Sequence, residues 1–449
     1  MKNYSIWQDF KRNDLKRLNC DLDCDILIIG GGITGCSMYY HLNDKYKVVL
    51  VEQNKIGDGK TARSTGKLTF MQNDLLDKIR KQNEDKASLY LKSQIDAIKI
   101  IKKIIEEENI KCDLEKTESI IYTNNSEEVK KIQDLKKFLS SNKIKIEVCN
   151  VDLVKMKYAI KANDTYIFNP SLFVYNYLKN KENIYENTKI INMKRKDNLY
   201  YCYTKNHVIK SKYVIIASHY PYFNIPYIFP LKGYLEKSYL LAGIKKYDKT
   251  SLISYSNPYI SIRTYKNKMI YLSNSDDSCK NINDSKNFNE LIKKASDILL
   301  FPMYLWTNSD IITNDNLPYV GKIKDNLFIA TGYNTWGLTN GILSGKIIRD
   351  ILDNKDNPYI ELFNPLRINL IKEVKTISNI SKNIVGYMNG LIDHNNKYFC
   401  THMYCPLIYN KTENTYDCPC HGSRFDINGE VIVSPANKNL KIKDWKSIN

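Results

Sequence analysis

Four residues near the C-terminus have the types and spacing of a metal site. They form two pairs, Cys400-x-His402 and Cys418-x-x-His421, in a chain that has 11 cysteines and only 6 histidines. Two thiolates and two imidazoles can hold one zinc ion tetrahedrally. The same four ligands can hold a two-iron cluster, in which two Cys ligate one iron and two His the other. The residues alone leave both centres open.

A second candidate site lies near the N-terminus, where glycines follow a short apolar run. Gly30-x-Gly32-x-x-Gly35 stands between DILII at 25–29 and a stretch with helical character, and a second apolar strand then ends at Glu52. This strand–turn–helix–strand pattern is typical of dinucleotide binding, with a pyrophosphate at the helix N-terminus and the acidic residue on a ribose. A glycine-rich turn of a plain α/β domain is the alternative. The residues expected at the cofactor here are Gly30, Gly32, Ile33, Thr34, Gly35 and Glu52.

The elements that must position these two sites are visible in the hydrophobic patterning. Residues 76–108 have helical spacing, and 117–220 mix short strands and helices before ending in the apolar strand YVIIAS. Residues 233–310 alternate polar and apolar side chains, as half-buried strands do. Residues 327–352 predict a strand, a glycine-containing loop and a helix, and 354–366 have the composition of a linker.

Several of these stretches resemble FAD-dependent oxidoreductases of the D-amino acid oxidase, glycine oxidase and sarcosine oxidase type. They are ARSTGKLT (62–69), YENTKIINM (185–193), KYVIIASHYP (212–221) and the long segment from LPYVGK to RDIL (317–352). The resemblance implies FAD as the cofactor. It implies further cofactor contacts at Thr65, Gly66, Ile190, Ala217, Gly332, Trp336, Gly337, Leu338 and Thr339.

The C-terminal pairs lie in CTHMYC and CPCHGSRFD, which resemble the two ligand boxes of Rieske proteins. This resemblance favours a [2Fe–2S] cluster over zinc, and it implies a disulfide between Cys405 and Cys420. It also implies that Ser423 donates a hydrogen bond to a cluster sulfide. Phe425 stands where high-potential Rieske proteins carry a tyrosine, so we expect a potential below the respiratory range.

A FAD domain followed by a Rieske domain resembles a group of bacterial FAD-dependent oxidoreductases. The implied fold is an α/β FAD-binding (Rossmann-like) domain with an inserted α+β antiparallel-sheet substrate domain, plus a small all-β Rieske domain. The expected FAD-binding segments are 1–75, 160–220 and 311–353, and the expected substrate or cap segments are 76–159 and 221–310. A linker at 354–379 and a Rieske domain at 380–449 complete the predicted organisation.

Catalytic residues are harder to find in the sequence. His219 and Tyr220 follow the predicted flavin-side strand, and Arg263 in SIRTY could hold a substrate carboxylate through a bidentate pair. A packed histidine and a surface arginine are the alternatives. Trp306 and Asp310 precede the last flavin segment, where core packing would also explain them.

Together these features predict an enzyme that oxidises a small amine or amino-acid-like substrate and exchanges electrons between FAD and the cluster. The alternative is a redox relay without a small-molecule substrate. The formal charge of +18 would then attract an acidic ferredoxin- or flavodoxin-like partner. It also raises the possibility of a polyanion partner, but the lysines form no compact block, so we expect no nucleic-acid binding.

The sequence also indicates in which compartment the protein is found. The first residues lack the apolar segment of a signal peptide, and no run of apolar residues is long enough to span a bilayer. Cysteines outside the C-terminal group are scattered, as in proteins of a reducing compartment. We therefore expect a cytoplasmic protein without a membrane span.

Overall fold

The computed structural model describes most of the chain. It covers residues 1–219, 232–247, 250–256, 259–274, 284–367, 398–402, 404–411, 413–418, 422–433, 436 and 438–441. Three residues named above, Tyr220, Cys420 and His421, lie outside the described residues.

The first sheet carries the predicted dinucleotide-binding pattern. Its central strands run in the order β16-β17-β10-β1-β2-β7, with the hairpin β8–β9 added beside β10. The strands β17, β10, β1, β2 and β7 pair in parallel, and α1 connects β1 to β2. The predicted strand–helix–strand start is therefore confirmed. The elements are β1 (Leu22–Ile29), α1 (Ile33–Leu42), β2 (Val48–Val51), β7 (Ile184–Tyr185), β8 (Asn192–Lys196), β9 (Leu199–Tyr203), β10 (Val208–Ile216), β16 (Tyr319–Lys324) and β17 (Leu327–Thr331).

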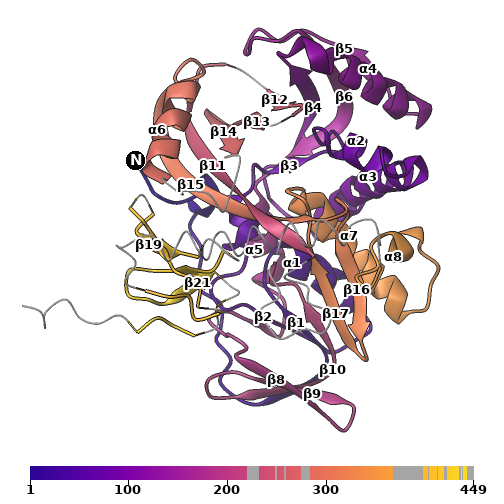
Figure 1. Ribbon diagram of the computed structural model, residues 1–449. Helices are drawn as coiled ribbons and strands as arrows, with labels where there is room; N and C mark the ends of the chain where they lie inside the picture. The colour runs from indigo at the N-terminus through magenta and orange to yellow at the C-terminus, as the bar shows by residue number, and fades with distance from the viewer. Residues whose placement is uncertain are drawn as a thin grey trace, which may run out of the picture.

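The helix α7 (Gly337–Leu352) completes the predicted late strand–loop–helix and packs closely on α1 (Figure 1). Ser37 Oγ on α1 donates to the Ile342 carbonyl oxygen at 2.5 Å. A Cβ at Gly345 would lie 2.5 Å from the Ser37 oxygen, so only glycine allows this approach. The two helix N-termini are thereby held on the same side of the sheet, where the first and last glycine loops meet.

A second, mixed sheet of nine strands stands beside the first. Its order is β15-β11-β14-β13-β12-β4-β6-β3, with β5 paired to β6, and all pairs except β12–β4 are antiparallel. The strands expected at 233–310 are thus confirmed in part, because the helix α6 (Asp284–Ala295) lies between β14 and β15. The strands are β3 (Lys67–Leu68), β4 (Glu115–Thr123), β5 (Ile146–Val148), β6 (Tyr158–Ile167), β11 (Gly233–Lys245), β12 (Ser251–Ser254), β13 (Ile260–Tyr265), β14 (Lys268–Asn274) and β15 (Leu299–Thr313).

The helical regions differ from the prediction at two further places. The helical stretch at 76–108 is broken after Arg80, because Asn83 leaves the helical conformation and its side chain caps the next helix at Lys86 N, 2.8 Å away. The expected linker at 354–366 contains a short helix that begins at Pro358, anchored by a 2.7 Å bond from Tyr359 to Asp96. The elements are η1 (Ile6–Gln8), η2 (Lys60–Arg63), α2 (Leu75–Arg80), α3 (Glu84–Glu107), α4 (Ser126–Ser141), α5 (Pro170–Leu178), α6 (Asp284–Ala295) and α8 (Pro358–Leu362).

The C-terminal part forms a small antiparallel sheet in the order β18-β19-β20-β21, drawn in yellow in Figure 1. A separate apolar cluster, which includes Cys400, Cys418 and Phe425, forms its core. Within the described part of the chain, no helix has both the length and the apolar character needed to cross a membrane. The strands are β18 (Ile408–Asn410), β19 (Thr415–Asp417), β20 (Arg424–Phe425) and β21 (Val431–Val433).

Candidate cofactor and substrate site

A cavity of about 270 Å³ lies where the glycine turn after β1, the end of β10 and the N-terminus of α7 meet. Most of the cofactor residues predicted from the sequence line it. These are Gly30, Gly32, Ile33, Thr34, Glu52, Thr65, Ile190, Ala217, Trp336, Gly337, Leu338 and Thr339.

Three predicted glycines do not line the cavity but allow close packing behind it. A Cβ at Gly35 would lie 1.9 Å from the Gly30 oxygen, so the helix could not approach the turn. Gly66 and Gly332 both have φ of +72°, a backbone conformation that other residues rarely adopt. The structure therefore shows a backbone requirement for each of these glycines, and their contacts with the cofactor stay a prediction.

Glu52 is fixed by main-chain donors at the end of β2. Its carboxylate accepts from Gly31 N at 2.8 Å and from Asn54 N at 2.9 Å. Burial raises the pKa of this carboxyl, while the two backbone donors oppose the rise. Each oxygen keeps a further lone pair, so the group can still accept from ribose hydroxyls, as predicted.

The N-terminus of α7 offers a second polar contact surface. Trp336 and Gly337 begin the helix and line the cavity, so the first main-chain amides of a 16-residue helix face it. The indole Nε1 of Trp336 is buried and has no hydrogen-bond partner in the described residues. A buried donor without a partner is costly, and an acceptor on a bound cofactor would satisfy it. The residues present therefore fit FAD.

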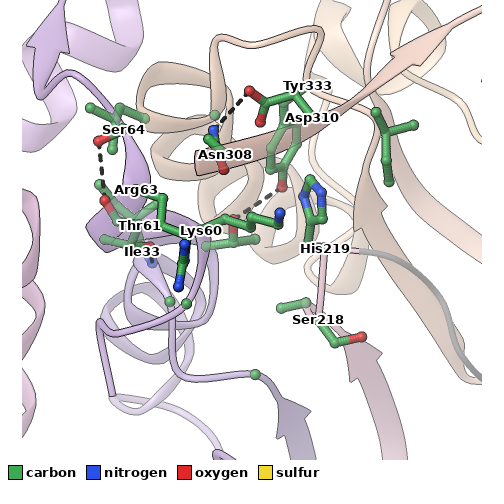
Figure 2. Close-up of a pocket in the computed structure, with 18 of the residues that line it drawn as sticks. Ile33, Lys60, Thr61, Arg63, Ser64, Ser218, His219, Asn308, Asp310 and Tyr333 are labelled. Carbon is green, nitrogen blue, oxygen red and sulfur yellow. Dashed lines mark hydrogen bonds between the residues drawn. The ribbon is translucent and has the colours of Figure 1, made fainter. Parts of the chain in front are cut away.

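One wall of the cavity carries Lys60, His219 and Asp310, which converge on it from three different elements (Figure 2). Asn308 Nδ2 donates to Asp310 at 2.9 Å. Burial raises the pKa of Asp310 and lowers that of Lys60, while the charge of each partly offsets the effect on the other. Both pKa values are thereby moved toward neutral pH, where the two groups can exchange protons.

His219 lies where the sequence predicted, at the cavity and just beyond β10. Its Nε2 is 3.1 Å from the Ser309 carbonyl oxygen, so in the neutral ring this nitrogen must carry the proton. Burial and the charge of Lys60 lower the pKa of His219 to about 3. The imidazole is therefore neutral near pH 7, and only its Nδ1 is available as an acceptor.

Arg263 is not where we predicted it. Its guanidinium is fully buried and donates to the carbonyl oxygens of Thr65, Gly66 and Phe168. It does not line the cavity. The structure thus places Arg263 as a structural cation between β3 and β13, rather than as the substrate-binding group that its sequence context suggested.

Lys67 is the cation that does line the substrate side of the cavity. It is 5% exposed, and its Nζ donates to the Leu252 oxygen at 2.7 Å and to Ser261 Oγ at 2.8 Å. Burial and the charge of Arg263 lower its pKa well below the usual value. No carboxylate in the described residues pairs with Lys67, so an anionic ligand would be its natural counter-charge.

The cluster ligands are only partly within the described residues. Cys400 and Cys418 are both buried and belong to one apolar cluster, so the two loops that carry the ligand boxes meet. His402 follows on the first loop, while His421 lies outside the described residues. Among the described residues, no three His, Cys, Asp or Glu side chains gather closely enough to hold a metal by themselves. The two buried thiols fit the half of the predicted centre in which two cysteines ligate one iron.

The predicted surroundings of the cluster can be placed in part. Ser423 is fully buried and its Oγ accepts from Ala436 N at 2.9 Å, which leaves its hydroxyl proton for another acceptor. Phe425 is also fully buried. Cys405 does not belong to the free cysteines, but Cys420 lies outside the described residues, so their pairing stays a prediction.

These features define a flavin-dependent oxidoreductase that carries an iron–sulfur domain, and comparison with known proteins agrees. Residues 25–351 match the family model "FAD dependent oxidoreductase", and residues 394–444 match "Rieske [2Fe-2S] domain". The chain therefore belongs to the FAD-dependent oxidoreductase family, with FAD and a [2Fe–2S] cluster as its cofactors. The predicted family resemblance, fold class and cofactors are confirmed.

Individual relatives cover either the whole chain or one part of it. The chain is 28% identical to the Rieske 2Fe-2S iron-sulfur protein YhfW of Bacillus subtilis, over 94% of this chain and 93% of that one. A cytochrome b6-f complex iron-sulfur subunit of Nostoc is 36% identical over 15% of this chain and 37% of its own length. Glycine oxidase from Geobacillus kaustophilus shares the fold with a TM-score of 0.63 and 15% identity, over 78% of this chain and all of that one. L-amino acid deaminase from Proteus vulgaris shares the fold with a TM-score of 0.64 and 15% identity, over 81% of this chain and 98% of that one.

Sequence reasoning missed Lys60 and Lys67 as cavity residues. Both stand in or beside the stretch that resembles flavoproteins, but a lysine in a chain of 67 Lys and Arg carries no signal of its own. It also missed Ile432 and Val433, which line the cavity from the C-terminal domain. No local pattern connects a strand of the Rieske domain with a cavity formed by residues almost 400 positions earlier.

Proposed function

We propose that this enzyme oxidises a small amine or amino-acid-like substrate and passes the electrons to its own Rieske cluster. Bound FAD would supply the acceptor for a hydride equivalent from the substrate C–H bond, and the cluster would supply a one-electron acceptor. The observation that carries the proposal is a single cavity that joins the cofactor residues to Lys67 and to the Lys60–Asp310 pair.

The roles of these residues follow from their charges and places. Lys67 would bind a substrate carboxylate and be protonated in that complex, because the carboxylate supplies the counter-charge that favours the charged amine against burial. An amine must lose its proton before it can give up a hydride. The pair of Lys60 and Asp310 would take up that proton, because burial holds both pKa values near the neutral range.

Support for electron exchange comes from the contact between the C-terminal domain and β11. A Cβ at Gly422, next to the predicted ligand His421, would lie 2.6 Å from Leu235 Cδ1. Leu235 packs with Ile311, and Ile311 lines the cavity. Gly422 of the second ligand box thus lies against a wall of the cavity.

The experiment is an anaerobic screen of amines and amino acids for bleaching of the flavin absorbance. We expect substrates with both an amine and a carboxylate to bleach the flavin, and their decarboxylated counterparts to bleach it more weakly. If no amine or amino acid bleaches it while an acidic ferredoxin or flavodoxin exchanges electrons with it, the protein is a redox relay instead.

A further inference from the structure

The C-terminal domain reaches into the cavity through its last described strand. Ile432 and Val433 on β21 line the cavity together with Gln53 and Asn54 from the segment after β2. Asn54 Nδ2 donates to the Ile432 carbonyl oxygen at 3.3 Å. The two domains therefore share one wall of the site.

This wall lies at the end of the cavity where Glu52 is fixed. The main-chain amide of Asn54 donates to Glu52, while its side chain donates to β21. Glu52 is the residue expected to bind ribose hydroxyls. Strand β21 consequently covers the end of the cavity that is expected to receive the adenosine part of FAD.

Buried charges hold the domain at this place. Arg424 donates to Glu413 at 2.7 Å and to Asp417 at 2.9 Å within the domain. Arg63, which lines the cavity, reaches Glu413 at 3.0 Å from the other side. The Thr307 hydroxyl also donates to Glu413. The side chains of Arg424 and Glu413 are only 7% and 4% exposed, so water does not compete for these bonds.

The contacts spread over several elements, which restricts rotation of the domain. Lys237 on β11 pairs with Asp417 at 3.3 Å, and Gly422 packs against Leu235 on the same strand. Within the domain, Arg424 is the ladder partner of Val433. The residue at the centre of the charge network and the residue in the cavity wall are therefore neighbours on adjacent strands.

We propose that the Rieske domain is a structural part of the FAD site, with β21 closing the Glu52 end of the cavity through Ile432 and Val433. FAD binding and docking of the C-terminal domain are then coupled, since each stabilises the arrangement that the other requires. The domain holds the cofactor as well as accepting its electrons.

The test uses the full-length protein with its cluster and measures the FAD dissociation constant. Val433→Asp places a carboxylate in the wall, and we expect it to weaken FAD binding at least tenfold. Val433→Ala removes only apolar contact. We expect a weakening of about threefold, less than the roughly 15-fold of two fully buried methyl groups, because Val433 is only partly buried. Ile427→Asp is the matched control, because Ile427 belongs to the same domain but is 42% exposed and does not line the cavity.

Iron and sulfide content is measured on each variant to show that the cluster is retained. Wild-type FAD affinity in both Val433 variants would overturn the proposal, as would equal weakening by Ile427→Asp. If Val433→Asp loses its cluster, the milder Val433→Ala decides. FAD retention is measured without substrate, so this result is independent of the screen that tests the proposed reaction.

Discussion

Two groups of buried charges lie within this molecule, and they differ in how their charges are matched. At the interface of the C-terminal domain, Glu413 and Asp417 each meet cations at 2.7 to 3.3 Å. At the cavity wall, Lys60 and Asp310 influence each other without an ion pair within 4 Å in the described residues. Burial is common to both groups, so the difference comes from the distance between opposite charges.

The pKa values follow this difference. At the interface burial alone would raise the pKa of Glu413, but Arg424 and Arg63 overcome it and lower the value to about 2. At the cavity burial prevails, so the pKa of Asp310 rises and that of Lys60 falls. Close pairing keeps the interface groups charged and stabilises the contact between the domains. Incomplete pairing at the cavity lets Lys60 and Asp310 gain and lose protons near neutral pH, as acid–base catalysis requires.

The largest effect is expected when the interface loses its central carboxylate. Glu413→Gln leaves Arg424 and Arg63 buried with less counter-charge, and breaking a buried pair costs about 3–5 kcal/mol. Thermal or denaturant unfolding of the full chain measures it. Glu430→Gln, at an exposed position of the same domain, is the control and is expected to change stability by under about 0.5 kcal/mol.

The same carboxylate gives a pH dependence with a definite sign. A folded pKa of about 2 lies below the ordinary value of 4.5, so the stabilisation by Glu413 is complete above about pH 4.5 and is lost as the pH falls toward 2. Glu413→Gln should flatten this part of the stability profile. An unchanged acid profile in the variant would show that Glu413 is not held charged by its neighbours.

At the cavity, Lys60→Met should lower the rate of flavin reduction by substrate about 100-fold, in the range of general acid–base catalysis. Burial lowers the pKa of Lys60 to about 7. In the wild type the rate of flavin reduction should therefore rise through pH 7, as the side chain of Lys60 loses its proton and can act as a base. Stopped-flow absorbance across pH measures both. Lys322→Met, at an exposed position on β16, should keep the wild-type profile. An unchanged rising limb in Lys60→Met would assign the titration to another group.

Lys67→Met should raise KM for a carboxylate-bearing substrate about 10- to 100-fold with little change in kcat, because hydrogen bonds to charged groups contribute about 1.5–3 kcal/mol. The matched control is an amine without a carboxylate, for which the variant should behave like the wild type. Equal losses for both substrates would mean that Lys67 supports the fold of the cavity instead of binding the acid group.

The smallest effects are expected at the cluster. Ser423→Ala removes a buried hydroxyl and should lower the midpoint potential by about 40 mV, which corresponds to one hydrogen bond of about 1 kcal/mol. Phe425→Tyr adds a hydroxyl at a buried position and should raise it by a similar amount. Redox titration followed by EPR measures both. Shifts of the same sign in the two variants would contradict this assignment.

The local parts of the fold and site could be predicted from the sequence. The strand–turn–helix at Gly30 and the strand–loop–helix before Leu352 follow from apolar runs and glycines that lie close together in the chain. The break after Arg80 was missed, because the helical spacing continues across it and only the capping side chain of Asn83 ends it. The short helix in the predicted linker was also missed, because only its cap Asn357 and its first residue Pro358 indicate it.

Roles that depend on tertiary contacts could not be predicted. Arg263 and Lys67 are both buried cations near the same strands, and only the fold decides which one lines the cavity. The domain boundaries remain predictions, and β6 pairs in the second sheet although its residues extend into the segment expected to bind FAD. The contact of β21 with Asn54 joins distant parts of the chain and has no local signal.

We propose that FAD and the cluster exchange electrons within one chain. The most direct measurement is anaerobic stopped-flow absorbance, in which substrate reduces the flavin and the cluster band is followed at several protein concentrations. We predict that cluster reduction follows flavin reduction with a rate constant that does not depend on protein concentration. A rate proportional to protein concentration, or a cluster that stays oxidised beside a reduced flavin, would contradict it.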